Sequence, residues 1–336
     1  MNSEKTVGLT FDLKTDYEFK DDDPPDANAE FDHPSTIDVI SSAIESQGFL
    51  VKRIGNVSHL LENIGNLNNV DIVFNISEGL QGRNRESQVP VLLEMAGIPF
   101  VGSDALTLGL TLDKVMAKKI FISENIPTPK FFEVKPEDAD SILDLDHMKF
   151  PMFVKPRFEG SSKGLTQSSR VENLEELKEQ VDRVVRLYKQ PALVEEFISG
   201  EEFTVAVIGN DPPEVMPIVQ IKIDGKLKLR DKFYTFGHVT SDHLQYMCPA
   251  RIKDELKKKI SDLAIKTYRT VECLDFGRVD FRVDQEGNPY VLEINPLPSL
   301  SSEDVFMSVA KALGISYNEM IGRILRTAMK RKGLLN

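Results

Sequence analysis

The segment from Gly277 to Asn295 reads GRVDFRVD, QEGN, PYVLEIN, and it constrains the fold of this chain more than any other stretch. Apolar and polar residues alternate on both sides of a short polar run, which is the pattern of two antiparallel strands joined by a turn. We predict the turn at Gln285–Asn288, so that a four-residue loop pairs Asp284 with Pro289.

Counting back along this hairpin places Asp280 opposite Glu293, and Arg278 opposite Asn295. Side chains alternate along a strand, so the core face is predicted to carry Val279, Phe281, Val283, Leu292 and Ile294. Asp280, Glu293 and Asn295 share the other face. Two opposed carboxylates repel each other unless a cation lies between them, and these oxygen donors suit Mg²⁺. The alternative is a solvated strand face on which arginines neutralise the acids.

A second candidate site is VKPRFEGSSKG, residues 154–164, which reads as a strand ending in Lys155 followed by a small flexible loop. Backbone N–H groups of such loops can bind phosphate oxygens; a plain turn is the alternative. Neither GxxxxGK[ST] nor GxGxxG occurs. Lys114, in LTLDK, lies on a predicted helix.

The first hundred residues alternate between strand and helix patterns, which indicates an open, mostly parallel α/β unit. Predicted strands are Val7–Phe11, Leu50–Ile54, 70–76 and Pro99–Val101, and predicted helices are Ser35–Gln47, Ser58–Ile64 and Ser87–Ala96. Residues 15–33, here called the acidic segment, form a polar loop rich in aspartate.

A second unit is predicted to begin near Ser103, with one helix over Leu106–Glu124 and another over Glu172–Gln190. Strands are predicted at 130–134, 150–156 and on both sides of Gly200. The last part combines strands with a helix over Lys253–Tyr268 and closing helices. The fold class is therefore α/β, or α+β overall, in three lobes: 1–104, 105–200 and 201–336.

The formal net charge of −12 over 336 residues argues against nucleic acid and anionic membrane as partners. The two cysteines, Cys248 and Cys273, form no CxxC pair, which favours a reducing cytoplasm. No apolar run is long enough to span a membrane, and the first residues lack a signal-peptide pattern.

Several segments, taken in order, resemble the ATP-grasp superfamily, and within it the D-alanine–D-alanine ligases. They are VFNISEGLQGRNRESQVPVLLEMAGIPFVGSDALTLGLTLDK, FVKPRFEGSSKG, LVEEFISGEEFTVAV, QYMCPA and FGRVDFRVDQEGNPYVLEINPLPS. The resemblance implies a three-lobed ATP-grasp fold that clamps ATP between two lobes, with two Mg²⁺ ions for which Mn²⁺ can substitute. It also implies small amino-acid-like substrates, and a homodimer by analogy with family members.

The resemblance assigns a role to each matching position. Asp280, Glu293 and Asn295 would hold the metal ions. The phosphates would meet Lys114 and Lys155, under a mobile loop carrying Ser161 and Ser162. Adenine would meet the segment Glu195–Ile198, including Glu196, and Glu202 would hold the ribose. The oxyanion would be stabilised by Arg278 and the backbone N–H of Ser299.

The sequence departs from the ligases where amino acids would bind. Glu78 stands in place of a histidine, or is a surface acid. Glu30 and Asp32 are candidates for the glutamate that binds the first substrate's amine. Asp304 replaces a serine that grips a carboxylate, a role that Ser301 or Ser302 could assume.

The ligases have a lysine–tyrosine pair shortly before the segment that matches QYMCPA, and in this chain those two positions fall on His238 and Val239. Lys232 or Tyr234 could take over the roles of the pair. The alternative is that the loop differs in length without consequence for function. We therefore expect an ATP-dependent carboxylate–amine ligase whose substrates differ from two D-alanines. The alternatives are the cell-wall D-alanine–D-alanine ligase itself, a phosphotransferase on the same frame, and a nucleotide-binding module without activity.

Overall fold

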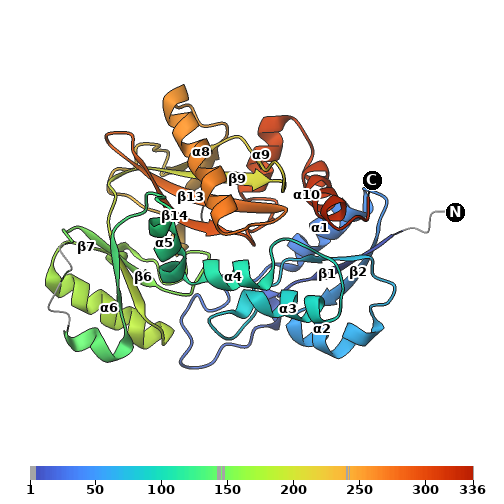
Figure 1. The fold of residues 1–336 in the computed structure, drawn as a ribbon. Helices are drawn as coiled ribbons and strands as arrows, with labels where there is room; N and C mark the ends of the chain where they lie inside the picture. Colours follow the sequence, from blue (N-terminus) through green and yellow to red (C-terminus); the bar gives the residue numbers. More distant parts are fainter. Residues whose placement is uncertain (1–4, 142–144, 146–147, 240, 242, 336) are drawn as a thin grey trace.

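Three β-sheets follow one another along the chain in the computed structural model, which describes residues 5–141, 145, 148–239, 241 and 243–335 (Figure 1). The first sheet is parallel, in the order β2-β1-β3-β4. Its strands are β1 (Thr6–Thr10), β2 (Leu50–Gly55), β3 (Ile72–Asn75) and β4 (Phe100–Val101), and its helices are α1 (Pro34–Glu45), α2 (Val57–Asn63) and α3 (Gln88–Met95). This confirms the α/β unit expected from the alternating pattern.

The second sheet is antiparallel, in the order β5-β8-β6-β7, and has a core of its own. It consists of β5 (Phe131–Val134), β6 (Met152–Pro156), β7 (Arg170–Val171) and β8 (Ala192–Glu196). Helix α6 (Leu174–Tyr188) packs on β6 through Leu177, Val181 and Val184. Because these apolar residues recur every three or four positions, one face of a charged helix becomes the cover of the sheet.

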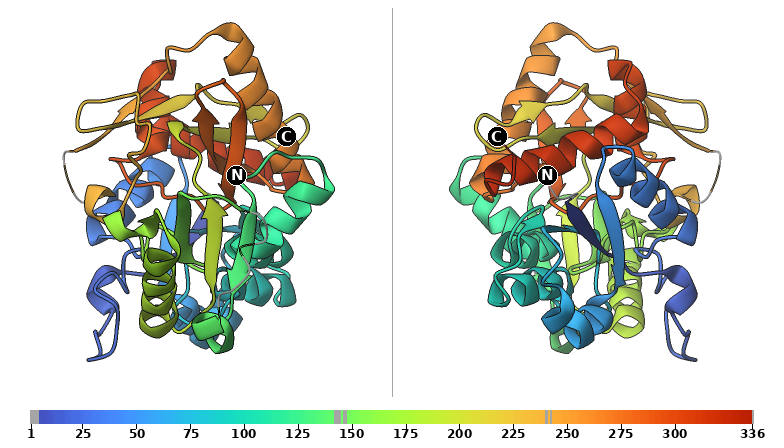
Figure 2. Two further views of the ribbon diagram at one scale, coloured as in Figure 1. Left: turned by 90° about the vertical axis from the view of Figure 1, so that its left-hand side faces the viewer. Right: turned by 90° about the vertical axis from the view of Figure 1, so that its right-hand side faces the viewer.

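The third sheet is also antiparallel, in the order β12-β11-β9-β13-β14, with β10 paired to β9. Its strands are β9 (Gly200–Ile208), β10 (Glu214–Val215), β11 (Val219–Ile223), β12 (Leu244–Met247), β13 (Phe276–Asp284) and β14 (Pro289–Asn295). Helix α8 (Asp254–Thr270) covers it, and the short α7 (Phe236–Val239) lies between β11 and β12 in the sequence. Figure 2 shows this sheet above the other two.

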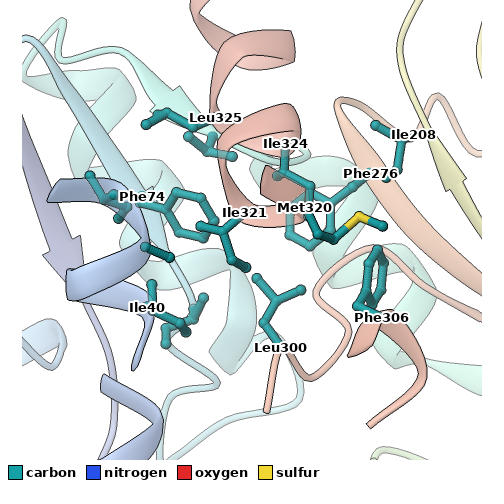
Figure 3. Packing of buried hydrophobic residues seen from close by; sticks show 14 of the residues in the cluster. Ile40, Phe74, Ile208, Phe276, Leu300, Phe306, Met320, Ile321, Ile324 and Leu325 are labelled. Carbon is teal, nitrogen blue, oxygen red and sulfur yellow. The ribbon is translucent and has the colours of Figure 1, made fainter. Parts of the chain in front are cut away.

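The last two helices return to the first sheet. Helices α9 (Val305–Leu313) and α10 (Tyr317–Arg331) place Phe306, Ile321 and Ile324 in one buried cluster with Ile40 of α1 and Phe74 of β3 (Figure 3). Phe276 and Ile208 of the third sheet belong to the same cluster. The first sheet, the third sheet and the C-terminal helices are therefore joined by one continuous core.

The helix predicted over Leu106–Glu124 is in fact two helices, α4 (Ala105–Leu112) and α5 (Lys114–Ser123). Asp113 between them is extended, and its carboxylate accepts the N–H of Met116 as the cap of α5. The same carboxylate binds Arg157, with Nη2 2.6 Å from Oδ2. The prediction of a single helix was wrong because local periodicity does not show a break that is made by capping and by a distant arginine.

The hairpin follows the prediction near the site and departs from it near the turn. Asp280 pairs with Glu293, and Arg278 with Asn295, as expected, but Val283 rather than Asp284 pairs with Pro289. A bulge after Asp280 absorbs the difference. Val291 consequently lies in the core, whereas Leu292, predicted there, lines a cavity. The Asp284 carboxylate accepts the N–H groups of Glu286 and Asn288, which widens the turn by one residue.

Among the helices of the described residues, none is long and apolar enough to cross a membrane.

Candidate active site

A cavity of about 950 Å³ is lined by the second and third sheets and by loops that follow strands of the first. Every residue that the sequence analysis assigned to nucleotide, metal or catalysis lines it: Lys114, Lys155, Ser161, Ser162, Glu195, Glu196, Ile198, Glu202, Arg278, Asp280, Glu293, Asn295 and Ser299. The structure thus brings these residues together, although their individual roles stay predictions.

The paired carboxylates of β13 and β14 face this cavity. Asp280 accepts hydrogen bonds from Thr204 Oγ1 at 2.6 Å, Asn295 Nδ2 at 3.0 Å and Arg278 Nε at 3.1 Å. Glu293 forms an ion pair with Lys114, with Nζ 3.1 Å from Oε2. Each acid is therefore held in place by a cation or a neutral donor and keeps its position on the cavity wall.

The two acids differ in their acidity. Burial and the charge of Glu293 raise the pKa of Asp280 above its usual value, against the opposing effect of Arg278. Burial acts in the same direction on Glu293, but Lys114 and Lys155 outweigh it and lower its pKa to about 2. A divalent cation between the acids would stabilise both in their charged form.

The donor set at this position fits a divalent cation that also binds a substrate. Within the described residues, no group of three or more His, Cys, Asp or Glu side chains could hold a metal ion by itself. Two carboxylates and the Asn295 amide leave several coordination positions for water and phosphate oxygens, which is how Mg²⁺ is usually bound beside nucleotides.

Two lysines and a buried glutamate form the wall between α5 and the second sheet. Lys155, at the end of β6, lies 2.8 Å from Glu195 Oε2, and Lys118 of α5 lies 2.5 Å from Oε1. Burial opposes the charge of Lys155, but Glu195 and Glu293 outweigh it and raise its pKa. Burial dominates at Lys118 and lowers its pKa to about 8. Two cations around one acid leave positive charge for an anionic ligand such as phosphate.

Sequence reasoning missed Lys118. The available signal was its spacing, because a lysine four residues after Lys114 lies on the same face of a helix. Its ammonium also donates to Thr128 Oγ1 at 2.6 Å, and Thr128 donates to the Val291 carbonyl of β14. Lys118 therefore links α5 to both sheets that enclose the cavity.

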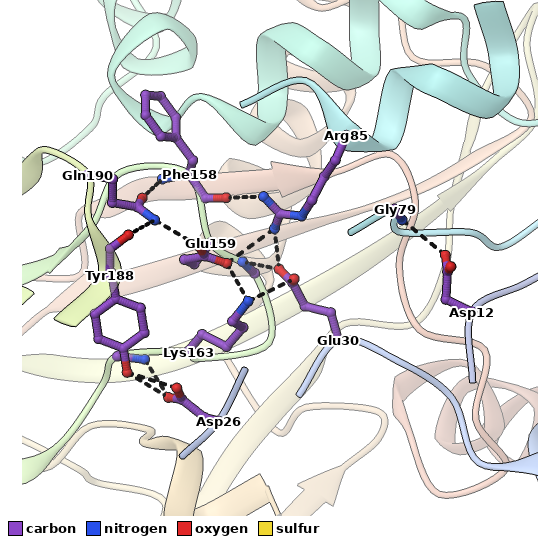
Figure 4. A network of polar contacts seen from close by, with 12 residues as sticks. Asp12, Asp26, Glu30, Gly79, Arg85, Phe158, Glu159, Lys163, Tyr188 and Gln190 are labelled. Atoms are coloured by element: carbon purple, nitrogen blue, oxygen red, sulfur yellow. Dashed lines mark hydrogen bonds and ion pairs between the residues drawn. The ribbon is translucent and has the colours of Figure 1, made fainter. Parts of the chain in front are cut away.

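The 157–164 loop, which follows β6, reaches over the lysines. Ser161 and Ser162 both have positive φ, 45° and 58°, a conformation that non-glycine residues rarely adopt. Lys163 beside them forms ion pairs with Glu159 at 2.6 Å and with Glu30 of the acidic segment at 3.3 Å. Figure 4 shows Glu30 at the centre of a polar network that joins the first sheet to this loop.

A flat apolar pocket occupies the opposite end of the cavity. Phe153, Phe197 and Phe233 meet there with ring centroids 4.9 to 6.1 Å apart. Glu202 lies close by, 3.4 Å from Arg282 Nη1, and burial raises its pKa despite this arginine. Phe197 lies in the segment that the sequence analysis assigned to adenine, but Phe153 and Phe233 were missed, because they look like ordinary core positions in a linear sequence. An aromatic base packed against these rings, with an acid at its edge, would fit this pocket.

The end that adjoins the first sheet is strongly acidic. Glu78 and Glu86 line the cavity and share a hydrogen bond. Burial and the charge of Glu30 raise the pKa of Glu86 to about 7, and burial and the charge of Glu86 raise that of Glu78 well above its usual value. Burial likewise raises the pKa of Asp32 to about 7. Glu78 is therefore part of the cavity wall, and the reading of it as a surface acid was wrong.

Glu30 differs from its acidic neighbours because cations surround it. Arg85 Nη2 lies 2.7 Å from Oε1, and the Gly160 N–H donates to the same oxygen at 2.6 Å. Burial disfavours its charge, but Arg85 and Lys163 outweigh burial and lower the pKa of Glu30 to about 2. Of the two candidates for binding a substrate amine, Asp32 has fewer competing cations.

Asp304 caps helix α9, because its Oδ1 accepts the Val305 N–H at 2.6 Å. Tyr246, from the QYMCPA segment, donates to the same carboxylate at 3.4 Å, and Tyr234 lines the cavity beside it. Asp304 lines the cavity, and its carboxylate lies near enough to Arg278 to interact with the charge of this arginine.

The candidates for the lysine of the family's lysine–tyrosine pair, which would contact the γ-phosphate, are not among the described residues that line the cavity. His238 contacts Thr235, with Nδ1 2.8 Å from Oγ1, and Lys232 forms an exposed ion pair with Asp224. Among described residues neither lines the cavity, and the side chain of Val239 lies outside the described part. Tyr234 and its neighbour Phe233 are residues of this stretch that line the cavity.

Comparison with known proteins follows the same division of the chain. Residues 120–326 match the family model described as the C-terminus of D-ala D-ala ligase. A D-alanine–D-alanine ligase of Carboxydothermus hydrogenoformans is 35% identical over 88% of this chain and 93% of its own length. An uncharacterized protein of Sinorhizobium fredii is 38% identical over 77% of this chain and 75% of its own.

The crystal structure of D-alanine–D-alanine ligase from Bacillus anthracis, complexed with ATP, has the same fold, with a TM-score of 0.75. The match covers 98% of this chain and 99% of the other, at 22% identity. The three sheets, the cavity between them and the sequence matches lead to one conclusion: this chain belongs to the D-alanine–D-alanine ligase family, whose members are ATP-grasp enzymes that form C–N bonds.

Proposed function

We propose that this protein is an ATP-dependent carboxylate–amine ligase that works through an acyl phosphate. The observation that carries the proposal is the opposed pair Asp280 and Glu293, set in one cavity with Lys114 and Lys155. These groups supply what phosphoryl transfer needs, which is charge neutralisation and positioning.

ATP would lie with its base among the three phenylalanines and its phosphates toward Lys114 and Lys155. Mg²⁺, or Mn²⁺ in its place, would be held by Asp280, Glu293 and Asn295, and would neutralise phosphate charge when bound. Glu202 is positioned to accept hydrogen bonds from the ribose hydroxyls. The family resemblance implies two ions.

The reaction proceeds in two steps. A substrate carboxylate oxygen attacks the γ-phosphorus, and ADP leaves. The nitrogen of a second substrate then attacks the acyl carbon, and phosphate leaves as the C–N bond forms. Arg278 and the backbone N–H of Ser299 would stabilise the oxyanion of the tetrahedral intermediate, while Ser161 and Ser162 cover the phosphates and keep water from the acyl phosphate.

The substrates are proposed to differ from two D-alanines. Asp32, Glu78 and Glu86 bring three carboxyl groups with raised pKa values to the substrate end, and Asp304 stands where a second carboxylate would be received. An ammonium group bound beside these carboxyl groups would favour their ionised form and be attracted by it, whereas a carboxylate would be repelled. A substrate with an additional positive charge would therefore fit better than D-alanine.

The second candidate is the cell-wall D-alanine–D-alanine ligase itself, which is favoured by the 35% identity to relatives of that name. Phosphate release measured over a panel of amino acids, with mass spectrometry of the products, separates the candidates. A condensed product together with ADP and phosphate supports a ligase, and a phosphorylated substrate alone would contradict it. The lobe boundaries at 1–104, 105–200 and 201–336, the cytoplasmic location and the homodimer stay predictions.

A further inference from the structure

The acidic segment contacts the 157–164 loop through two carboxylates, those of Asp26 and Glu30. The segment is closed at its base, because the Lys14 N–H donates to the Asp32 carbonyl and the Asp32 N–H to the Asp12 carbonyl, both at 2.9 Å. Tyr17 stiffens it from within by donating to Asp23 at 2.7 Å. A segment whose ends are joined and whose interior is bonded can hold another loop in a fixed position.

Asp26 of this segment contacts the last residue of the loop. It is 4% exposed, and Oδ2 accepts the Gly164 N–H at 2.8 Å (Figure 4). Both carboxylate oxygens also accept from the Tyr188 hydroxyl of α6, at 2.8 and 3.0 Å. Burial and the neighbouring Asp26 raise the pKa of Tyr188, so the phenol stays protonated and remains a donor.

The contacts of Asp26 and Glu30 bracket the two serines. The Gly160 N–H donates to Glu30, and the Gly164 N–H to Asp26, so that Ser161 and Ser162 lie between two fixed amides. Gly164 has a φ of +80°, and a Cβ there would lie 2.5 Å from Pro156, so this end of the loop requires glycine. The loop is therefore closed by contacts inside the protein, which do not depend on nucleotide.

We infer that Asp26 is a positioning residue that holds the 157–164 loop closed over the phosphates, through Gly164 and through Tyr188 of α6. The inference rests on the proposed function, because closure matters where an acyl phosphate must be kept from water. The acidic segment then holds the 157–164 loop in place through Asp26 and Glu30, and these two acids are not simply solvated charges of a surface loop.

Trypsin provides the first test, since its site after Lys163 is the peptide bond whose N–H is bonded to Asp26. We expect Asp26→Ala, without nucleotide, to be cut at Lys163 about tenfold faster than the unmodified protein, from the loss of charge-assisted hydrogen bonds. Asp22→Ala is the matched control. It removes an exposed ion pair between the same segment and Lys189 and should leave the cleavage rate unchanged. Equal rates for Asp26→Ala and the unmodified protein would overturn the inference.

Tyr188→Phe is a second variant, to be used if Asp26→Ala does not fold. It removes one partner of Asp26 and leaves the Gly164 contact, so cleavage at Lys163 should accelerate by a smaller factor. If Asp26→Ala loses its sheet structure, this second variant decides, and an unchanged rate in it overturns the inference.

A second measurement is the ratio of phosphate released to condensed product formed. Substitution of a residue with a purely structural role would leave this ratio unchanged. The ratio should be near one in the unmodified protein and in Asp22→Ala, and should rise in Asp26→Ala as water reaches the acyl phosphate. A ratio that stays at one refutes the role in closure. If the unmodified protein forms no condensed product with any substrate, the proposed function fails, and the trypsin comparison still decides whether Asp26 holds the loop.

Discussion

Glu293 lies 3.1 Å from Lys114 and opposite Asp280, so its charge serves both a lysine and the proposed metal. We expect Glu293→Gln to lower kcat/KM by about two orders of magnitude or more, because a neutral amide binds Mg²⁺ weakly. The fold should lose little stability, since the change also relieves repulsion with Asp280. Kinetics at saturating Mg²⁺ together with a thermal melt would test both expectations.

Glu201→Gln is the control for that experiment, because Glu201 is on β9, pairs with Gln220 and is not among the residues that line the cavity. Its turnover should be unchanged. Near-normal turnover of Glu293→Gln would contradict the metal assignment.

Lys155 lies at the end of a strand with its ammonium 2.8 Å from Glu195. We expect Lys155→Ala to weaken binding of a non-hydrolysable ATP analogue by roughly 1.5–3 kcal/mol, the loss of one charge-assisted hydrogen bond. Isothermal calorimetry would measure this. Lys130→Ala removes an exposed lysine whose pairing with Glu196, at 3.6 Å, is weak, and it should bind normally. An unchanged affinity in Lys155→Ala would mean that this lysine makes no phosphate contact.

The acidic wall makes stability depend on pH. The pKa values of Asp32 and Glu86 are raised to about 7 in the folded protein, so folding favours their protonated forms. That contribution is complete below about pH 4, where the unfolded chain also binds these protons, and declines as pH rises toward 7. We expect the melting temperature to fall between pH 5 and pH 7.

Glu86→Gln removes one of these titrations and should flatten that slope. Melting curves of both proteins at several pH values would show it. A parallel decline in the two proteins would exclude Glu86 as a cause.

At the scale of elements, Asp113 connects the break between α4 and α5 to the start of the 157–164 loop. It is 1% exposed, caps α5, and binds Arg157 through both carboxylate oxygens, at 2.7 and 2.6 Å. We expect Asp113→Ala to lower the free energy of unfolding by about 2–4 kcal/mol, since it removes the cap of α5 and two charged hydrogen bonds and leaves Arg157 with Glu133 as its remaining ion-pair partner. Urea denaturation would measure it. Asp113→Asn keeps a capping oxygen and should cost less; equal losses would show that the cap contributes nothing.

The hairpin shows how far the elements could be predicted from the sequence. Alternation fixed which residues share a face, so the pairs Asp280–Glu293 and Arg278–Asn295 were predicted correctly. The bulge at Leu292 was not, because it depends on a side-chain-bonded turn at Asp284 and on which of Val291 and Leu292 fills the core. A local sequence pattern predicts where a strand lies and which of its residues share a face. The pairing register near a turn depends instead on tertiary packing.

The candidate site divides in a similar way. Residues inside short, ordered motifs were found from the sequence, and all of them line the cavity. Glu86, Phe153 and Phe233 were missed because only the fold brings them there, and Lys118 was missed although its spacing from Lys114 was visible. Glu30 was named as a candidate for binding a substrate amine, and the fold pairs it with Arg85. Ion pairs between residues of different lobes cannot be predicted from any single segment of the sequence.

On the scale of the whole molecule, we expect a poor D-alanine–D-alanine ligase. The nucleotide end carries the residues of the family pattern, while Glu78 and Asp304 depart from it at the substrate end. His238, which is not among the described residues that line the cavity, stands where the family has a lysine. Each lost charged contact to a substrate typically lowers kcat/KM by about two orders of magnitude. Phosphate release with D-alanine, compared with L-amino acids, basic amino acids and hydroxy acids, tests this. The highest kcat/KM for D-alanine would show that the departures are neutral.

The core shared by the first sheet and α10 has a consequence for how the protein is made. The chain leaves the ribosome from its N-terminus, so Phe74 and Ile40 emerge while Ile321 and Ile324 have not yet been synthesised. At ordinary translation rates this delay is on the order of tens of seconds. During it the nascent first sheet exposes an apolar surface that α9, α10 and the third sheet later cover, so folding of the first sheet should finish after release, and a chaperone should recognise the unfinished chain there.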